Sequence, residues 1–491
     1  MDRLVSAPRS RRAFFLPGAA LLLLLTPALA GQEASPPPAP TPALPALPAG
    51  IEPVSGELGD RVHGLLEKAE TLRGLKALRP ISAGTVDEAG LRAQMASSLR
   101  RQTDPARVRA LELGLKAFGL IPESMSLARF LVELMTEEVA GYYDTDGKFL
   151  VLVRRPPAAA AKDEKSEEEM VLVHELVHAL QDQHFDLHRF ETVDPASDES
   201  TALEALVEGD ATAAMLQGEM EIDPAFLPGI AVKLGKMMED PSLSRKMGEL
   251  PGGKVLDAAP AFLRESLLFS YLQGFLFVFA ARNAGGQVLL DHAFATDPPR
   301  STEQILHPEK WHGDRDDPVE IRLPDLAAEV PGLAAWAAGA ERAEGEMGEL
   351  GVRLLLRERL GDRERADRAA AGWSGDRYLV LAQGGDRRLV WLLDWDTEGD
   401  AAEFQREADR LGWGWRAERI APNRVAVLRG RWERKDRAEV LARLARVVAG
   451  QPANRRIDLA AIGARPASAD QAVPEDQDGA EGAPPPVSPR P

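Results

Sequence analysis

The stretch "VLVHELVHALQDQH", from Val171 to His184, decides how this chain is interpreted, because it sets three histidines and a glutamate among apolar residues. His174 and His178 are four residues apart, so on a helix their imidazoles lie about 40° apart and one turn along. Glu175 lies beside them, turned by about 100°. The pattern predicts a helix on which two histidines reach one ion and a carboxylate lies next to it.

The helix that carries these side chains is predicted to be largely buried. Two buried histidines and a buried glutamate cost free energy unless they have partners, and one metal ion satisfies all three. This is the His-Glu-x-x-His arrangement of zinc peptidases, in which zinc takes three protein ligands and keeps one position for water. The apolar residues around the motif are Val171, Leu172, Val173, Leu176, Val177 and Leu180.

His184 is one candidate for the third ligand, because its spacing from His174 is that of the metzincin pattern. That pattern has glycine where this chain has Gln181, and the glycine lets the helix stop so that the last histidine turns back to the metal. If the helix continues, His184 lies about 15 Å along from His174 and is rotated by about 280°. We therefore expect His184 to have a polar role away from the ion.

The other candidate lies downstream, in "ALEALVEGDATAAM" from Ala202 to Met215, which has Glu204 and Glu208 on one face of a predicted helix. In gluzincins a glutamate from the next helix is the third zinc ligand. The segment "LVEGDA" resembles the Asn-Glu-Gly-x-Ala stretch of gluzincin aminopeptidases, and this resemblance maps the ligand onto Glu208. Glu204, one turn away, is the reserve choice.

Several segments together resemble a group of exported prokaryotic proteins in the gluzincin class. They are "GYYD", "HELVHALQDQHFDL", "LVEGDA", "YLQGFLFV" and "STEQILHPEKW". The resemblance covers most of residues 55–315 and extends more weakly to "AAAGWSGDRYLVL". It implies a zinc-dependent metallopeptidase acting on a peptide or protein, and it brings no known substrate.

The predicted reaction is hydrolysis of a peptide bond by a zinc-activated water, with Glu175 as general base. The oxyanion that forms at the attacked carbonyl needs a further donor, for which Tyr271 and His307 are candidates. Asp182 and Asp210 are candidates for orienting a ligand imidazole.

Two alternatives remain open at the level of sequence. One is a non-catalytic zinc-binding or scaffold protein of the cell envelope, and the other is a metal-dependent hydrolase of a non-peptide substrate. Cleavage preference, endopeptidase or exopeptidase action and oligomeric state are not determined by the sequence.

Composition excludes several classes of protein. A net charge of -18 over 491 residues disfavours a nucleic-acid-binding protein, which would show a basic face. The chain has no cysteine, which excludes disulfides, cysteine zinc ligands, a cysteine nucleophile and a lipoprotein anchor.

The first 30 residues are predicted to be an export signal, with a basic start, an apolar run and the ending Ala28-Leu29-Ala30. Ser10 to Phe15 also resembles the twin-arginine signal, and the twin-arginine and general routes both remain open. We expect a periplasmic or extracellular protein with no membrane span after the signal is removed.

The predicted fold class is α+β. Residues 31–50 read as a Pro/Ala-rich linker, residues 51–335 as a mostly helical zincin-like domain, residues 336–465 as a small α+β domain and residues 466–491 as a disordered tail.

Within the first domain a hairpin is predicted from Gly141 to Val153, with its turn at Asp144 to Gly147. In zinc peptidases the strand before the motif helix is an edge strand that pairs with extended substrate, and this hairpin occupies that place. A capping box from Ser166 to Glu169 is predicted to start the motif helix.

The second domain is predicted to contain a hairpin around Gly384 to Asp386, a helix from Glu398 to Leu411, a strand in "NRVAVLRG" and a helix from Lys435 to Val448. No catalytic constellation is evident in it. Its tryptophans are predicted to serve packing, at positions 373, 391, 395, 413, 415 and 432.

Overall fold

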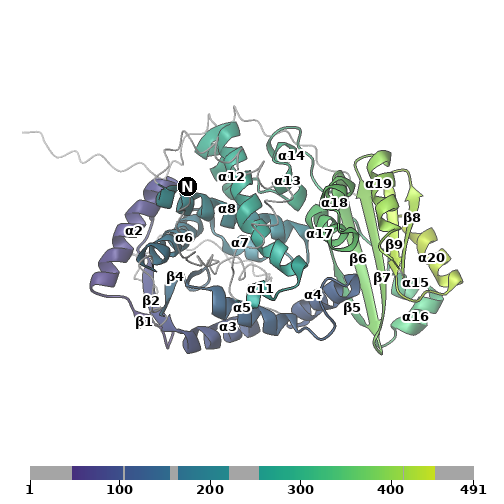
Figure 1. Cartoon of the computed structure of the whole chain (residues 1–491), viewed down its shortest axis with the longest axis horizontal. Helices are drawn as coiled ribbons and strands as arrows, with labels where there is room; N and C mark the ends of the chain where they lie inside the picture. Colours follow the sequence, from purple (N-terminus) through teal and green to yellow (C-terminus); the bar gives the residue numbers. More distant parts are fainter. Residues whose placement is uncertain (1–46, 103–104, 155–163, 221–253, 413, 448–491) are drawn as a thin grey trace, which may run out of the picture.

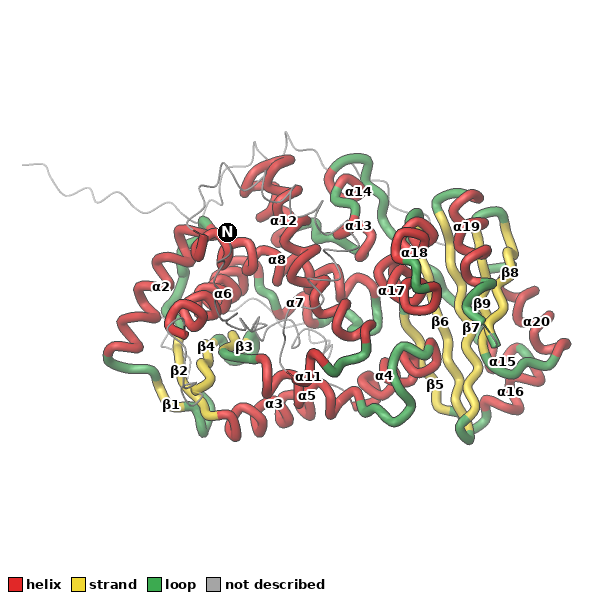
Figure 2. Tube along the Cα trace, in the orientation of Figure 1, coloured by secondary structure: helices red, strands yellow, loops and turns green. Residues whose placement is uncertain are grey.

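The chain has an α+β fold with two separate sheets, as the computed structural model shows (Figure 1). The structure describes residues 47–102, 105–154, 164–220, 254–412 and 414–447. The predicted export signal, most of the predicted linker and the predicted tail lie outside these residues. Helices dominate the first part of the chain, and most strand residues belong to the second sheet (Figure 2).

The first sheet has the order β1-β2-β4-β3. β3 and β4 form the hairpin that the sequence predicted. β3 is an edge strand, whereas β4, the strand that directly precedes α6, lies between β2 and β3. β4 also pairs in parallel with β2, which the sequence analysis did not anticipate. The strands are β1 (Glu52–Pro53), β2 (Ser82–Asp87), β3 (Gly141–Asp144) and β4 (Phe149–Arg154).

Helices pack around this sheet and form the larger part of the first domain. The motif helix α6 begins at Glu164, so the capping box predicted at Ser166 is wrong, because Ser166 already lies within the first helical turn. The helices are α2 (Glu57–Arg73), α3 (Glu88–Gln102), α4 (Pro105–Phe118), α5 (Leu127–Glu138), α6 (Glu164–Phe185), α7 (His188–Glu191), α8 (Asp198–Met220), α11 (Lys254–Asp257), α12 (Ala261–Ala295), α13 (Thr302–Leu306) and α14 (Glu309–His312).

Helices α8 and α12 approach each other so closely that their contact requires glycine. A Cβ on Gly274 would lie 2.0 Å from the carbonyl oxygen of Ala205, and a Cβ on Gly209 would lie 2.1 Å from the backbone carbon of Gly274. Both glycines belong to segments that carried the family resemblance. This contact sets the distance between the two helices and how α8 is turned about its axis.

Helix α12 is, by length and composition, apolar enough to cross a membrane. Half of its most apolar window is buried in the protein, where it packs on α8. Its backbone leaves the helical region at Gly285 and at Gly286, where φ is +67°. A helix at the centre of a helical domain needs the same apolar composition.

The second sheet is entirely antiparallel, in the order β5-β6-β7-β9-β8. The hairpin, helices and strand predicted for this part are confirmed, whereas β5, β8, α17 and α18 were not anticipated. The elements are α15 (Leu326–Glu329), α16 (Pro331–Ala337), β5 (Glu341–Gly345), α17 (Gly348–Leu360), α18 (Arg363–Ala370), β6 (Trp373–Gln383), β7 (Asp386–Trp395), α19 (Glu398–Ala408), β8 (Trp415–Ala421), β9 (Arg424–Arg429) and α20 (Arg434–Leu444).

Both faces of this sheet are covered by helices. Helices α15, α16 and α20 pack on one face, and α4, α17, α18 and α19 pack on the other. Because α4 comes from the first part of the chain, side-chain packing crosses the boundary predicted between residues 335 and 336. The indole N–H groups of Trp373 and Trp391 both donate to the buried carboxylate of Asp376, in agreement with a packing role for these tryptophans.

The contact between α8 and α12 makes a prediction for stability. Gly274→Ala forces a methyl group into the backbone of α8, so we expect it to lower the free energy of unfolding by roughly 1–3 kcal/mol in a urea titration. Gly64→Ala is the control, since Gly64 lies within α2 with nothing within 4 Å of its Cβ position. The control should be neutral or stabilising by up to about 1 kcal/mol. Equal stability of the two variants would contradict the proposed close contact.

Candidate metal site

Three side chains converge at the centre of the helical domain. His174 Nε2 lies 3.0 Å from Glu208 Oε2, His178 Nε2 lies 3.5 Å from Glu208 Oε1, and the two Nε2 atoms are 2.9 Å apart. All three side chains are buried, with exposed fractions of 0%, 1% and 0% for His174, His178 and Glu208. We call these three residues the triad.

The triad comes from two packed helices. α6 supplies both histidines on one face, as their spacing predicted, and α8 supplies Glu208. The structure brings Glu208, rather than Glu204, to the histidines. Helix α6 continues through Gln181 to Phe185, and His184 Nε2 donates to the backbone carbonyl of Lys76 at 2.7 Å. His184 therefore lies away from the triad, as expected.

A buried polar network contacts Nδ1 of His178, the ring nitrogen that does not face Glu208. His178 Nδ1 donates to Gln181 Oε1 at 2.9 Å, and Gln181 Nε2 donates to Asp210 Oδ2 at 2.9 Å. Arg73, fully buried, pairs with Asp210, and Arg282 donates to Asp210 Oδ1 at 3.1 Å. The two guanidinium groups compensate the buried carboxylate, so Asp210 acts on the imidazole through Gln181.

Sequence analysis had considered Gln181 only as the position that lacks a glycine. Its spacing of three residues from His178 puts the two side chains on one face of the helix, and this signal was available in the sequence. The other candidate for orienting the imidazole, Asp182, faces elsewhere. It accepts from the hydroxyl of Tyr143 at 2.9 Å and from Lys148 Nζ at 2.8 Å. Asp182 therefore fastens the hairpin to α6.

Glu175 is held by the edge strand of the first sheet. Its Oε2 accepts a hydrogen bond from the backbone N–H of Tyr143 at 2.9 Å, and its side chain is fully buried. Tyr143 lies opposite Leu150 in the β3–β4 pair, and its N–H donates to Glu175 instead of to β4. The unpaired edge of β3 thus faces the motif helix beside Glu175.

Tyr271 of α12 lies next to the triad. Its ring centroid is 6.2 Å from that of His174, and its side chain is buried. Burial raises the pKa of Tyr271 well above its ordinary value, and the carboxylates of Glu208, Glu204 and Glu175 raise it further. The hydroxyl therefore stays protonated and remains a hydrogen-bond donor.

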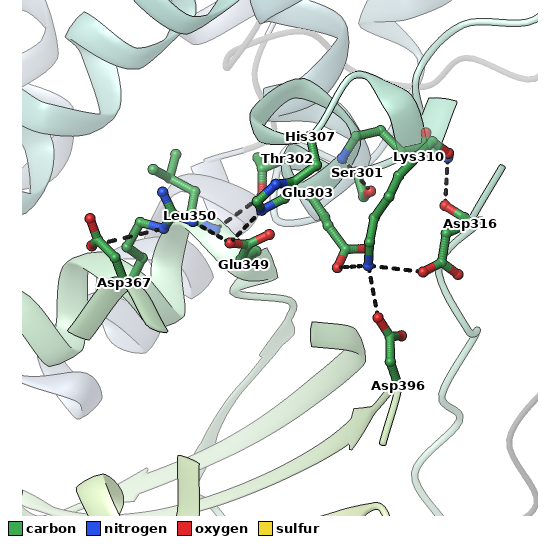
Figure 3. Close-up of polar contacts among 12 residues, drawn as sticks. Ser301, Thr302, Glu303, His307, Lys310, Asp316, Glu349, Leu350, Asp367 and Asp396 are labelled. Carbon is green, nitrogen blue, oxygen red and sulfur yellow. Dashed lines mark hydrogen bonds and ion pairs between the residues drawn. The ribbon is translucent and has the colours of Figure 1, made fainter. Parts of the chain in front are cut away.

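The structure does not bring His307 to the triad. His307 follows the end of α13, and its Nε2 lies 3.2 Å from Glu349 Oε1 on α17 (Figure 3). His307 Nδ1 also lies 3.9 Å from Glu309 Oε1. The expectation that His307 lies beside the triad is wrong, because the end of α13 directs this side chain toward α17.

Two other groups of possible metal ligands occur among the described residues, and protein contacts account for both. In the group Glu303, Asp316 and Asp396, the ammonium of Lys310 lies 2.6–2.9 Å from all three carboxylates (Figure 3). In the group Asp146, His188 and Glu191, the half-exposed imidazole pairs with both carboxylates. Of the three groups, only the triad is fully buried.

Protonation of the triad follows from its burial and mutual contacts. Burial lowers the pKa of His174 to about 4. Burial alone would also lower the pKa of His178, but the adjacent Glu208 carboxylate outweighs it and raises this pKa to about 9. Burial opposes the charge on Glu208, yet His178 lowers the pKa of this carboxyl to about 2. Without a metal, these shifts favour a neutral His174, a protonated His178 and an ionised Glu208 at neutral pH.

The donor set is compatible with a divalent transition metal. Two imidazole nitrogens and one carboxylate are the ligands that zinc accepts at bond lengths of about 2.0–2.2 Å, which in a tetrahedral site places ligand atoms about 3.3 Å apart. The separations of 2.9–3.5 Å in the triad are close to this value. Gln181 accepts the Nδ1 proton of His178 and so keeps a proton on that nitrogen. The imidazole therefore binds a metal through Nε2, after the Nε2 proton is lost.

Comparison with known proteins identifies no relative of the helical domain that carries the triad. A family model described as "Domain of unknown function (DUF8575)" matches residues 336–458. The match covers the second sheet, begins where the sequence analysis placed the start of the second domain, and includes no residue of the triad. No curated protein and no solved structure matches the chain with significance.

The proton on His178 makes metal affinity depend on pH. Because a metal must displace this proton at any pH below about 9, we expect the apparent zinc affinity to fall about tenfold per unit as the pH drops from about 8 to about 6. A titration against a competing chelator would measure this slope. Calorimetry in two buffers should show about one proton released per zinc bound. An affinity independent of pH in this range would contradict the assignment.

The contact behind His178 makes a second prediction about affinity. Gln181→Ala removes the acceptor of the Nδ1 proton, so we expect zinc to bind roughly 10–100-fold more weakly in an equilibrium titration. Gln183→Ala is the matched control. Gln183 is on the same helix but accepts from the backbone of Leu78 and Arg79 near the surface, and its loss should leave zinc affinity within about twofold of the unsubstituted protein. Equal effects of the two changes would argue against the network.

Proposed function

We propose that this protein is a zinc-dependent metallopeptidase of the gluzincin type, exported from the cell. The observation that carries the proposal is the convergence of His174, His178 and Glu208 in a fully buried site with Glu175 alongside. A structural zinc site fills all four positions with protein ligands, whereas a catalytic site keeps one open. Three protein ligands with a carboxylate beside them favour catalysis.

The residues of the chain have distinct roles in this proposal. His174, His178 and Glu208 would hold the zinc ion, which when bound would act as a Lewis acid and lower the pKa of a bound water to about 7. Glu175 takes the proton of the attacking water, since its carboxylate is held near the triad by the N–H of Tyr143. Tyr271 donates its hydroxyl hydrogen to the negative charge that develops on the attacked oxygen.

The first sheet supports a peptide as substrate. β3 is an edge strand whose unpaired side lies by Glu175, and an extended peptide adds to such an edge through backbone hydrogen bonds. The N–H of Tyr143 is engaged by Glu175, so pairing would use the neighbouring backbone groups of β3. The edge presents the peptide backbone beside the proposed general base.

The proposal is tested by Glu175→Gln. The amide retains a carbonyl oxygen to accept from Tyr143 but cannot take a proton, so we expect kcat on a broad peptide library to fall by about 10²–10⁴. Zinc should remain stoichiometric, because Glu175 is not one of the proposed ligands. Glu169→Gln, on the same helix and away from the triad, is the control and should cleave as the unsubstituted protein does.

Two results would overturn the proposal. Undiminished cleavage by Glu175→Gln would remove the general base from the mechanism. Stoichiometric zinc without cleavage of any peptide would instead favour a non-catalytic zinc-binding protein.

A further inference from the structure

A cavity of about 140 Å³ lies between the helical domain and the second sheet. Helices α4, α5, α8, α12 and α17 supply most of its wall, and β6 contributes Tyr378. The wall consists mainly of leucine, phenylalanine, valine and methionine side chains, among them Leu115, Phe130 and Leu350. Neither the proposed mechanism nor the matched family model assigns a role to this cavity.

Two helices, α8 and α12, each have one residue at the triad and another in the wall of this cavity. On α8, Glu204 lines the cavity and Glu208 belongs to the triad. On α12, Leu267 lines the cavity and Tyr271 lies beside the triad. Each pair is separated by four residues, or about 6 Å along a helix. Both helices therefore put the near end of the cavity about one helical turn from the triad.

The lining also includes four ionisable side chains, those of Arg107, Asp198, Glu204 and Glu346. Glu204 lies at the end nearest the triad, and its side chain is only 3% exposed. Burial, reinforced by the charge of Glu208, raises the pKa of Glu204 well above its ordinary value. Asp198 lines another part of the wall and is already engaged by Thr302 through both its backbone N–H and its hydroxyl.

The size and lining of the cavity indicate an apolar occupant. A cavity of about 150 Å³ with apolar walls accommodates a benzene ring. Leaving such a space empty costs stability, because the side chains around it lose their packing contacts. A charged group would have to leave water to enter, and the apolar side chains that form most of the exposed wall would not compensate that loss.

We propose that this cavity is the specificity pocket of the site and that it receives a large apolar side chain, such as phenylalanine or leucine, next to the cleaved peptide bond. This inference rests on the proposed peptidase function. It also assigns a role to the second domain, because Met347, Leu350 and Tyr378 close one side of the pocket. The second domain then selects substrate without contributing to the triad.

The test fills the pocket from α12. Ser266 lines the cavity and is only partly buried, so Ser266→Phe places a ring inside it with little change elsewhere. For the zinc-loaded full chain we expect kcat/KM to favour peptides with Phe over Ala beside the cleaved bond by at least about tenfold. Ser266→Phe should reduce this Phe-to-Ala ratio by about tenfold or more. Val288→Phe, at an exposed position of the same helix, is the control and should keep the ratio.

A binding measurement separates failure of the pocket from failure of the proposed function. The uncharged probe N-acetyl-phenylalaninamide should bind the full chain at least about fivefold more tightly than N-acetyl-alaninamide, and Ser266→Phe should abolish the difference. If this binding holds but no peptide is cleaved, the peptidase proposal fails while the apolar pocket stands. Cleavage without a preference for apolar residues, a preference for lysine or arginine, or an unchanged ratio in Ser266→Phe would overturn the pocket.

Discussion

The burial of the Glu208 carboxylate between two imidazoles is the constraint on which the rest of the helical domain depends. A carboxylate with no exposed surface is tolerated only where charge or hydrogen bonds compensate the loss of water. His174 and His178 provide that compensation from α6, so α6 and α8 must be held at a fixed distance and rotation. The glycines at the α8–α12 contact help to meet this requirement, since any side chain there would push the two helices apart.

Support for the site extends outward in two directions. Behind His178, Gln181 connects the imidazole to a carboxylate that is neutralised by two arginines from distant parts of the chain. In front, the hairpin of β3 and β4 positions Glu175 through a backbone N–H and is itself tied to α6 by Asp182. Apart from the His178–Gln181 contact within α6, these contacts join residues from different elements. The geometry of the site is therefore a property of the assembled domain.

The two parts of the chain are joined by packing and by ion pairs. Helix α4 covers one face of the second sheet, and the segment around α13 and α14 reaches it through Lys310 and Asp396 and contacts α17 through His307 and Glu349 (Figure 3). The "STEQILHPEKW" segment is thus accounted for by contacts that hold the second domain against the first. The packing of the two domains against each other also encloses the apolar cavity, about one helical turn from the triad.

The parts of the fold and site that could be predicted from the sequence are those that depend on the spacing of residues close together in the chain. The relation of His174, Glu175 and His178 is decided within one helical turn, and the hairpin before α6 follows from alternation around a turn. The continuation of α6 through Gln181 was predicted from the lack of a helix breaker. By contrast, Glu204 and Glu208 lie on one face of α8, one turn apart, so which of them meets the histidines depends on where α8 lies along its axis relative to α6, and helix packing sets that. The partners of Asp210, the orientation of His307 and the apolar cavity arise only when distant segments pack, because no short-range pattern encodes which buried charges and side chains meet.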